Sequence, residues 1–514
     1  MQAGIPISHP RRRSVHRAAT AVAVIALLSV GLAARAQSPP GARIDPLIAP
    51  AEFRLGAERV RLPGDERMGL VGASYLIEVA PDVAIGPAAY GAITGRRGGL
   101  FTVGLGGVWE HRIAGPLGLE LGVYAGGGGG GNAPVGGGLM LRPHVGLLWE
   151  LGGYHAGVEL SQVRFVNGSI SSHQLGLVWS APADFRYVPA PVPGAGVAWN
   201  GPSGVGFDRL QAFVGAYRPR SGAARLSGGP LPAAISFVGI RLERPLDATV
   251  HWGIEAAGAA SGSVAGYAEA LATFGAETAL LDPRLAVGAR LGLGMGGGGD
   301  IAVGGGLLVK ASVYAGYQLT RAFSLALEGG LTQAPNGSFK AVQALGALQW
   351  KLGDTSAEAS GLPLPVTRTE WAAGLERYRA ARKDATERDL QAVALSISRF
   401  VAPQVYLSGQ VHSALGGGAG GFTAGLLGVG WQAPLVSRWR AGAELLAGAA
   451  GGGGVDVRGG RIVQPMAHLG YEVRPGLALQ LDAGYLRSSS GTLRSPVLGA
   501  SMAFSFGVGS LRGD

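Results

Sequence analysis

A passage of roughly 110 residues occurs three times in this chain, beginning near Gly69, Phe237 and Ala394. This internal period constrains the fold more than any other feature of the sequence, because each copy must form the same structural unit. Each copy also reaches a glycine run at the same internal point. The three runs are Gly126–Gly131, Gly296–Gly299 and Gly451–Gly454. We therefore expect three tandem copies of one unit.

Residues 1–36 have the pattern of a secretory signal peptide. Arg11, Arg12, Arg13 and Arg17 precede an apolar core, and small residues stand before Gln37. A membrane anchor is the alternative, but the apolar core is short for a spanning helix. We expect export across the inner membrane and removal of this segment.

The composition excludes several classes of protein. The leader holds five arginines (11, 12, 13, 17 and 35) and no acidic residue, so the net charge of +10 falls to 10 − 5 = +5 in the mature chain. That charge forms no basic stripe, so nucleic acid is not an expected partner. The chain has no cysteine, which rules out disulfides and thiolate metal sites. It is 47% hydrophobic and has 91 glycines, yet no mature segment has the pattern of a spanning helix. This combination favours β-structure in a bilayer.

The strand signal is an alternation of residue types with period two. In the third copy Leu477, Leu479 and Leu481 fall on one face of an extended segment, whereas Ala478 and Gln480 fall on the other. The apolar face is uninterrupted, and the second face is mostly small. It carries one charge at the same place in each copy, at Glu120, Arg290 and Glu444. This pattern is typical of a transmembrane barrel strand with its apolar face outward.

About eight such strands fit each copy. In the second copy we predict them at 209–219, 233–244, 249–260, 266–280, 285–296, 305–319, 323–334 and 340–352. The first strand is charged, and its counterpart in the third copy, Trp371–Tyr378, also fits a helix.

The connections alternate in length. The short ones carry proline at matching places, namely Pro81, Pro245 and Pro403, then Pro116, Pro283 and Pro434. The longer ones hold charged loops and the glycine runs. Barrels of the bacterial outer membrane place short turns toward the periplasm and long loops outside. Six aromatic residues are expected to form a belt at the short-turn end, where amphipathic rings favour the headgroup level. They are Trp149, Trp179, Tyr317, Trp350, Tyr471 and Phe506.

The closing strand of each copy carries a further pattern, Leu175-Gly176 before Trp179, Leu345-Gly346 before Trp350, and Leu498-Gly499 before Phe506. With the leader and the alternating strands, the chain resembles the outer-membrane β-barrel proteins of Gram-negative bacteria. Each copy is similar to a small eight-stranded barrel of the OmpA/OmpX type. The resemblance implies the bacterial outer membrane as location, insertion by the barrel-assembly machinery, and membrane lipids with lipopolysaccharide as partners. The chain departs from the family in residues 507–514, which continue past the last aromatic.

Three units can close separately or join into one ring of about 24 strands, which would leave an aqueous lumen. The Pro-rich stretches between the copies and the complete closing strands favour three small barrels. The small inward residues favour the large ring. We predict an all-β chain with a signal peptide (1–36), a linker (37–50), repeats at 51–181, 207–352 and 368–508, Pro-rich or short linkers at 182–206 and 353–367, and a tail (509–514).

The glycine runs do not fit a phosphate-binding loop, because no lysine follows in the required pattern and no helix is expected after them. We expect flexible loop tips there. An enzyme acting on lipid would need a nucleophile beside a base. His173, which follows Ser171 and Ser172, is the best candidate, but no histidine recurs in all three copies. We expect no catalysis, no cofactor and no metal site.

The inward-facing charges are the remaining candidate site. They are Glu120, Glu159, Arg290, Glu328, Glu444 and Asp482. We favour an interior ion-pair network, and a pore lining that sets selectivity is the alternative. The leading functional hypothesis is an integral outer-membrane protein with a structural or surface-interaction role. The alternatives are a porin-like transporter with one wide aqueous pore for small solutes and, third, a lipid-modifying enzyme.

Overall fold

The computed structural model describes residues 45–189 and 194–511. The signal peptide expected at 1–36 and the end of the expected tail lie outside these residues. Within them, no helix has the length and hydropathy of a membrane-spanning helix.

The first closed barrel, barrel 1, contains eight antiparallel strands. They are β1 (Leu47–Arg61), β2 (Arg67–Ala80), β3 (Val83–Thr94), β4 (Phe101–Ala114), β5 (Leu117–Gly129), β6 (Met140–Leu151), β7 (Tyr154–Phe165) and β8 (Ser171–Tyr187). β1 pairs with both β2 and β8, and Leu55 stands opposite Trp179. The closing strand therefore returns to the start of its own copy.

Barrel 2 closes in the same way through pairing of β10 with β17. Its strands are β10 (Arg209–Pro219), β11 (Ile235–Pro245), β12 (Val250–Ala259), β13 (Ala268–Leu280), β14 (Asp282–Gly297), β15 (Leu307–Gln318), β16 (Phe323–Gln333) and β17 (Lys340–Lys351). These bounds lie within a few residues of the strands predicted for the second copy, because alternation of residue types is a local signal.

Barrel 3 closes where β18 pairs with both β19 and β25. Its strands are β18 (Pro363–Ala381), β19 (Glu387–Phe400), β20 (Val405–Ala414), β21 (Thr423–Pro434), β22 (Trp439–Gly451), β23 (Arg461–Arg474), β24 (Leu477–Ser488) and β25 (Arg494–Gly509). Trp371–Tyr378 is part of β18 and is not helical. The prediction of an all-β chain is confirmed, and three small barrels replace the alternative of one large ring.

The strands extend into segments that we expected to be linkers. β1 begins at Leu47, β8 continues to Tyr187, and β18 begins at Pro363. Between the barrels lie β9 (Gly196–Ala198), which pairs with the start of β18, and the short helix α2 (Thr355–Ala359). At the end of β8 the alternation continues, with Phe185 and Tyr187 buried and Asp184 and Arg186 not buried. The backbone groups of these strand ends find partners across the ladder, as Leu47 does opposite Tyr187.

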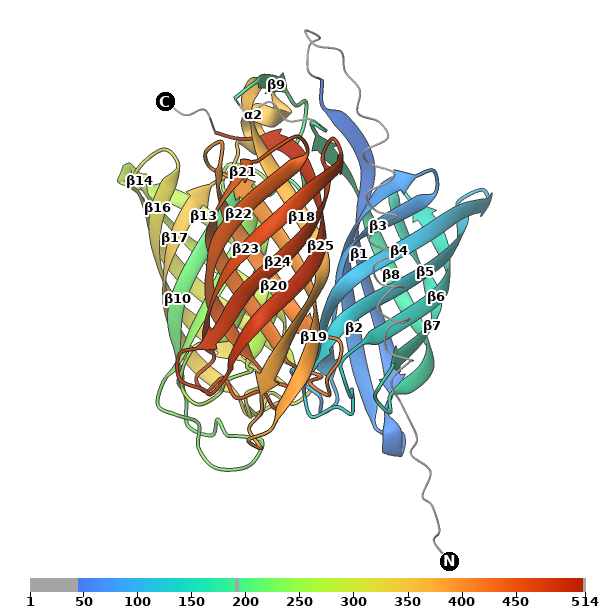
Figure 1. The fold of residues 1–514 in the computed structure, drawn as a ribbon, viewed down its shortest axis with the longest axis vertical. Coiled ribbons are helices and arrows are strands. Elements are labelled where there is room, and N and C mark those ends of the chain that lie inside the picture. Colours follow the sequence, from blue (N-terminus) through green and yellow to red (C-terminus); the bar gives the residue numbers. More distant parts are fainter. Residues whose placement is uncertain (1–44, 190–193, 512–514) are drawn as a thin grey trace, which may run out of the picture.

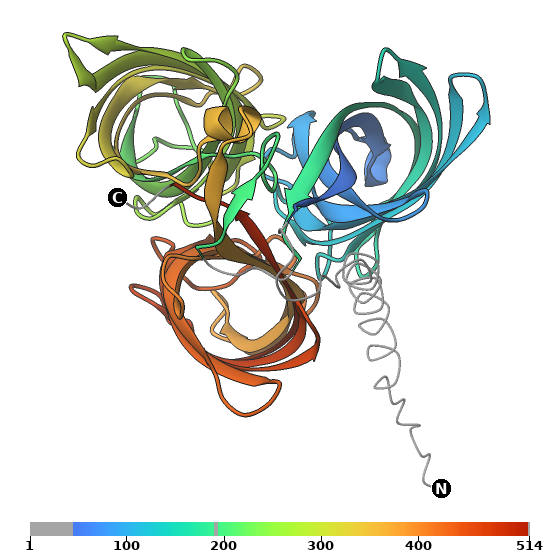
Figure 2. The same cartoon turned by 90° about the horizontal axis from the view of Figure 1, so that it is seen from above.

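The barrels stand side by side with their axes roughly aligned (Figure 1). We call one end the short-turn end, which includes the connections 81–82, 115–116 and 152–153 of barrel 1, together with β9 and α2. We call the other the loop end, which includes 95–100 and 130–139 of barrel 1 and their counterparts, 260–267 and 298–306 in barrel 2 and 415–422 and 452–460 in barrel 3. Seen along the barrels, three rings surround a common centre (Figure 2).

The glycine runs join the barrels at the loop end. Each run lies against the loop of a neighbouring barrel, so that backbone meets backbone. A Cβ placed on Gly99, Gly266 or Gly421 would stand 2.3, 2.8 and 2.8 Å from the backbone nitrogen of Gly298, Gly452 and Gly130, respectively. The backbone N–H of Gly98 also donates to the carbonyl oxygen of Gly304 at 3.0 Å, and that of Gly421 to Gly128 at 3.0 Å.

We call these three contacts the glycine junction. Barrel 2 meets barrel 1, barrel 1 meets barrel 3, and barrel 3 meets barrel 2 through equivalent segments. The contacts therefore form a closed cycle of head-to-tail interfaces, the arrangement that closes a ring. The expectation of flexible loop tips is wrong. The runs lack side chains because other backbones occupy the space that side chains would fill.

Candidate functional site

The interior of barrel 1 holds a network of buried ion pairs. Arg54 on β1 donates to both Glu120 on β5 and Glu159 on β7. Arg142 on β6 donates to Glu159 Oε2 at 2.6 Å, and its Nε lies 2.9 Å from Glu58 Oε1. All five side chains are buried. Each carboxylate thus has a guanidinium partner, which is the condition under which buried charge is tolerated.

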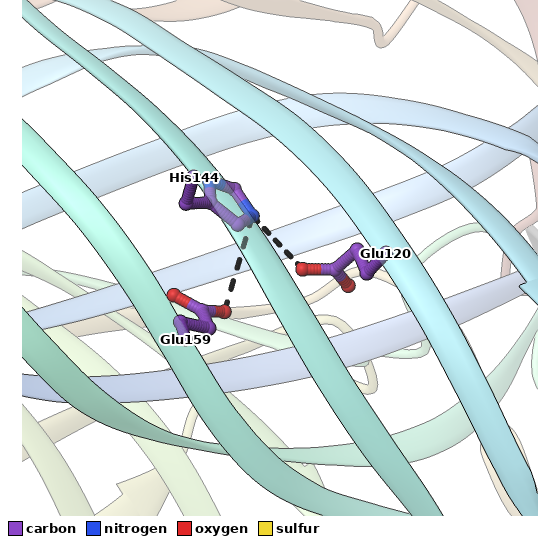
Figure 3. Close-up of side chains that lie close together, drawn as sticks. All are labelled: Glu120, His144 and Glu159. Carbon is purple, nitrogen blue, oxygen red and sulfur yellow. Dashed lines mark hydrogen bonds and ion pairs between the residues drawn. The ribbon is translucent and has the colours of Figure 1, made fainter.

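His144 adds a candidate metal site to this network (Figure 3). Its Nε2 atom lies 2.9 Å from Glu120 Oε1 and 3.9 Å from Glu159 Oε1, and the three ligand atoms lie within 4.8 Å of one another. Arg54 already bonds both carboxylates. The positive charge that a metal ion would supply is therefore present, and the cluster is complete as an ion-pair network.

Barrel 2 contains a denser network of the same kind. Arg241 donates from Nε to Glu255 Oε2 at 2.9 Å and lies 3.0 Å from Glu328 Oε2. Arg290 pairs with Glu243 at 2.6 Å and also bonds Glu328. Further pairs link Lys310 to Glu255 and Glu269, and the hydroxyl groups of Tyr217 and Tyr267 donate to Glu269. The interior charge of this barrel is fully paired.

Barrel 3 has fewer ion pairs. Arg440 holds Glu370 through two hydrogen bonds of 2.7 and 2.9 Å. Glu444 instead accepts from Gln410 at 2.6 Å and Ser408 at 3.1 Å, and Asp482 accepts from Gln480 at 2.8 Å. Among the described residues, neither Glu444 nor Asp482 has a cationic side chain within ion-pair distance, and both are only half-buried. Barrel 3 is therefore the least completely neutralised of the three.

The six charges named from the sequence all lie inside their barrels. Glu120 and Glu159 share the barrel 1 network, Arg290 and Glu328 share that of barrel 2, and Glu444 and Asp482 lie in barrel 3. Their partners Arg54, Arg142 and Arg241 were missed. The signal was present, since each is an inward position on an alternating strand, but the pairing partners come from strands far apart in the chain.

Loop residues close the mouth of each barrel at the loop end. In barrel 1 Leu62, Leu100, Val135 and Ile170 are buried in one apolar cluster with the strand residues around them. The corresponding plug residues are Val264, Ile301, Val303 and Phe339 in barrel 2, and Phe422, Val455, Val457 and Leu493 in barrel 3. These plugs were not predicted from the sequence. The apolar residues beside the glycine runs, such as Ile301 and Val303, were the available signal.

The expected aromatic belt is present in part. Trp149, Trp179, Tyr317 and Tyr471 are exposed on the outer surface. Phe506 is not, since it is 1% exposed and its ring centroid lies 5.2 Å from that of Phe185 in barrel 1. Phe506 is buried because the last strand of barrel 3 packs against barrel 1 and not against solvent or lipid. Trp350 lies on the wall of the cavity described below.

His173 lies exposed on β8, opposite Gln162 on β7. Among the described residues, no serine, cysteine or carboxylate is hydrogen-bonded to it. A nucleophile needs a base within hydrogen-bond reach, so the geometry does not support the catalytic interpretation of His173.

A cavity of about 1950 Å³ lies between the three barrels. Its walls are outward-facing apolar side chains from every barrel, including Ile85, Leu210, Ile240, Leu348, Leu395 and Leu407. It extends from the glycine junction, where Gly99, Gly266 and Gly421 line it, to the segments between barrels at the short-turn end, where Ser203, Asp208 and Glu358 line it. Five charged residues line the cavity: Asp208, Glu269, Glu358, Arg399 and Arg461.

Comparisons with known proteins do not identify the chain. No family model and no curated protein matches it. Among solved structures it is similar to the outer membrane protein OpdK of Pseudomonas aeruginosa, with 10% identity and a TM-score of 0.23 over 89% of this chain and 99% of that one. OccK8 (OprE) of the same organism gives 9% identity and a TM-score of 0.23 over 91% and 100%. OccAB3 of Acinetobacter baumannii gives 9% and 0.21 over 90% and 99%. TM-scores this low do not establish a shared fold, and the similarity of each repeat to the OmpA/OmpX type stays a prediction.

Proposed function

We propose that this chain is an integral protein of the bacterial outer membrane whose three filled barrels have a structural or surface-interaction role. The observation that carries the proposal is the combination of sealed interiors with apolar exteriors. Leucines such as Leu175, Leu327 and Leu481 are more than half exposed on the outer surfaces. In water such surfaces would associate, whereas in a bilayer they match the hydrocarbon.

The barrels are closed rings, so no strand edge would face lipid. Their interiors are filled by ion pairs and by the loop plugs, so the proposal includes no transport path through barrels 1 and 2. We place the short-turn end toward the periplasm and the loop end outside. Exposed arginines near the loop end of barrel 1, Arg59, Arg61 and Arg67, would then meet the phosphates of lipopolysaccharide. Insertion by the barrel-assembly machinery and the absence of catalysis belong to the same proposal.

An epitope-accessibility experiment tests this placement. One tag is inserted in the loop at 382–386 and a matched tag in the short turn at 435–438, both in barrel 3. Antibody should label intact cells that carry the first tag, and the second only after the outer membrane is permeabilised. The protein should also fractionate with the outer membrane and require detergent for extraction. Recovery of folded protein from the soluble fraction would contradict the proposal.

A porin-like transport function is the second candidate, and barrel 3 is the observation that favours it. Its Glu444 and Asp482 are half-buried and lack cationic partners among the described residues, so small cations could reach them. Swelling of proteoliposomes in salts and small sugars measures such permeation. Flux that depends on Glu444 and disappears in Glu444→Gln would support transport, and flux equal to that of empty liposomes would exclude it.

A further inference from the structure

The cavity between the barrels is too large to remain empty. Its volume of about 1950 Å³ is about twice the upper end of the range for pockets that hold drug-sized ligands, which reaches about 1,000 Å³. An empty apolar space of this size would deprive its lining of dispersion contacts. Water is a poor occupant, because the walls offer few polar partners for its hydrogen bonds. Hydrocarbon chains match both the size and the chemistry of the space.

At one equivalent position of the three barrels, the residue that lines the cavity is charged in barrel 3 alone. The glycines Gly56, Gly215 and Gly374 pair with Gly72, Phe237 and Ala394 in the three barrels. The residue five positions after each of these partners is therefore equivalent in the three barrels. These residues are Ile77, Leu242 and Arg399, and all three line the cavity. Two barrels thus present an aliphatic side chain at this position, and barrel 3 presents a guanidinium group.

Arg399 has no carboxylate within ion-pair distance among the described residues. Its Nη2 donates to the carbonyl oxygens of Leu352 at 2.6 Å and Gly509 at 2.8 Å. Gly509 also lies beside Glu358, since a Cβ on Gly509 would stand 2.3 Å from Glu358 Oε1. Glu358 accepts hydrogen bonds from the Ser203 backbone N–H at 2.8 Å and hydroxyl at 2.6 Å. One cation and two carboxylates, Glu358 and Asp208, therefore gather at the short-turn end of an apolar cavity.

We propose that this cavity binds a glycerophospholipid with a zwitterionic, amine-bearing headgroup. The acyl chains fill the apolar space between the barrels. Arg399 contacts the phosphate, as guanidinium groups do through charge-assisted hydrogen bonds, and the carboxylates of Glu358 and Asp208 lie near the ammonium group. The headgroup lies at the short-turn end, which is the periplasmic side under the proposed function, and the inference rests on that function for the membrane that supplies the lipid.

Lipid retained through purification tests the inference. The full chain is extracted from outer membranes in mild detergent, washed by detergent exchange, and its bound lipid is quantified by mass spectrometry per mole of protein. We expect a retained phospholipid enriched in the amine headgroup. Retention of lipopolysaccharide alone, or no lipid above that of an unrelated barrel, would overturn the proposal. Failure of the proposed function would be seen separately, as protein absent from the outer-membrane fraction.

Two matched pairs of variants locate the site. Gly425 lines the cavity, and a Cβ there meets nothing within 4 Å, so Gly425→Phe should fill the space and lower retained phospholipid roughly tenfold, because acyl burial is lost. Val158→Phe, on the exposed outer face of β7, which contributes no residue to the cavity wall, should leave retention unchanged. Arg399→Leu should lower the amount of retained phospholipid, because the phosphate loses its guanidinium partner, whereas Arg438→Leu in an exposed short turn should leave that amount unchanged. Equal retention in Gly425→Phe and wild type would contradict the site. If Gly425→Phe fails to show the heat-dependent gel shift of a folded barrel, Gly425→Leu replaces it.

Discussion

Gly451 of barrel 3 lies so close to barrel 2 that a Cβ added to it would stand 2.1 Å from the backbone nitrogen of Gly266. Equivalent contacts join the other two pairs of barrels, so the glycine runs are packing surfaces. Three barrels that close separately are thereby held as one body around a shared apolar cavity.

Substitution of Gly451 tests the glycine junction. Gly451→Ala adds one methyl group where no space exists, and overpacking costs about 1–3 kcal/mol. Gly425→Ala is the control, because its Cβ meets nothing within 4 Å. Urea unfolding in lipid vesicles should show the loss for Gly451→Ala alone. Equal stability of the two variants would mean that the barrels are not in contact there.

The outward assignment of the leucine faces predicts different effects for adjacent residues on β24. Leu479 is exposed on the outer surface, whereas Gln480 points inward and donates to Asp482. Leu479→Arg should destabilise the protein by about 2–4 kcal/mol if it lies near the middle of the bilayer. Gln480→Arg should have a mild effect, since the new charge lies beside a carboxylate. Equilibrium unfolding in vesicles measures both, and a larger loss for Gln480→Arg would reverse the assignment.

Loss of an interior carboxylate should lower the free energy of unfolding more in barrel 2 than in barrel 3. Glu328 bonds both Arg241 and Arg290, so Glu328→Gln leaves buried cations without full compensation, at a cost of about 3–5 kcal/mol. Glu444 accepts only from neutral groups in the described chain. Its neutral amide replacement should therefore cause no measurable loss of unfolding free energy. The reverse order would show that the networks are wrongly identified.

Because Glu358 in α2 is buried among the segments between the barrels, we expect the stability of the protein to depend on pH. Burial raises the pKa of this carboxyl above its ordinary value of about 4.3. The folded state therefore holds the proton more tightly than the unfolded state. The stability that this carboxyl contributes is fully present below about pH 4 and is lost as the pH rises through the folded pKa. Unfolding midpoints measured across this window should fall in wild type more than in Glu358→Gln, and parallel curves would contradict the burial of Glu358.

Much of the fold could be predicted from the sequence because its signals are local. Alternation of residue types gives strands such as β16 and β17 nearly residue for residue, and matched prolines give the short turns. The number of barrels depends on which strands pair, and there the complete closing strand ending at Trp179 was informative, since it returns to Leu55 of its own copy.

The remaining features depend on contacts between distant segments. A glycine run shows only that side chains are missing, and Gly130 meets Gly421 from a different copy. The interior pairs join strands far apart in the chain, as Arg54 joins Glu120, so the inward charges could be placed but not matched. Phe506 follows the belt pattern in sequence, yet its position is determined by packing against Phe185 in another barrel.

Electrical recording from the folded protein in planar bilayers tests the central claim most directly. Ion pairs fill barrels 1 and 2, loop plugs close the mouth of all three barrels, and an apolar cavity separates the barrels, so we expect no continuous aqueous path. We predict no stable conductance step after insertion is confirmed by the heat-dependent gel shift. A reproducible step that persists over time would contradict the account of three filled barrels.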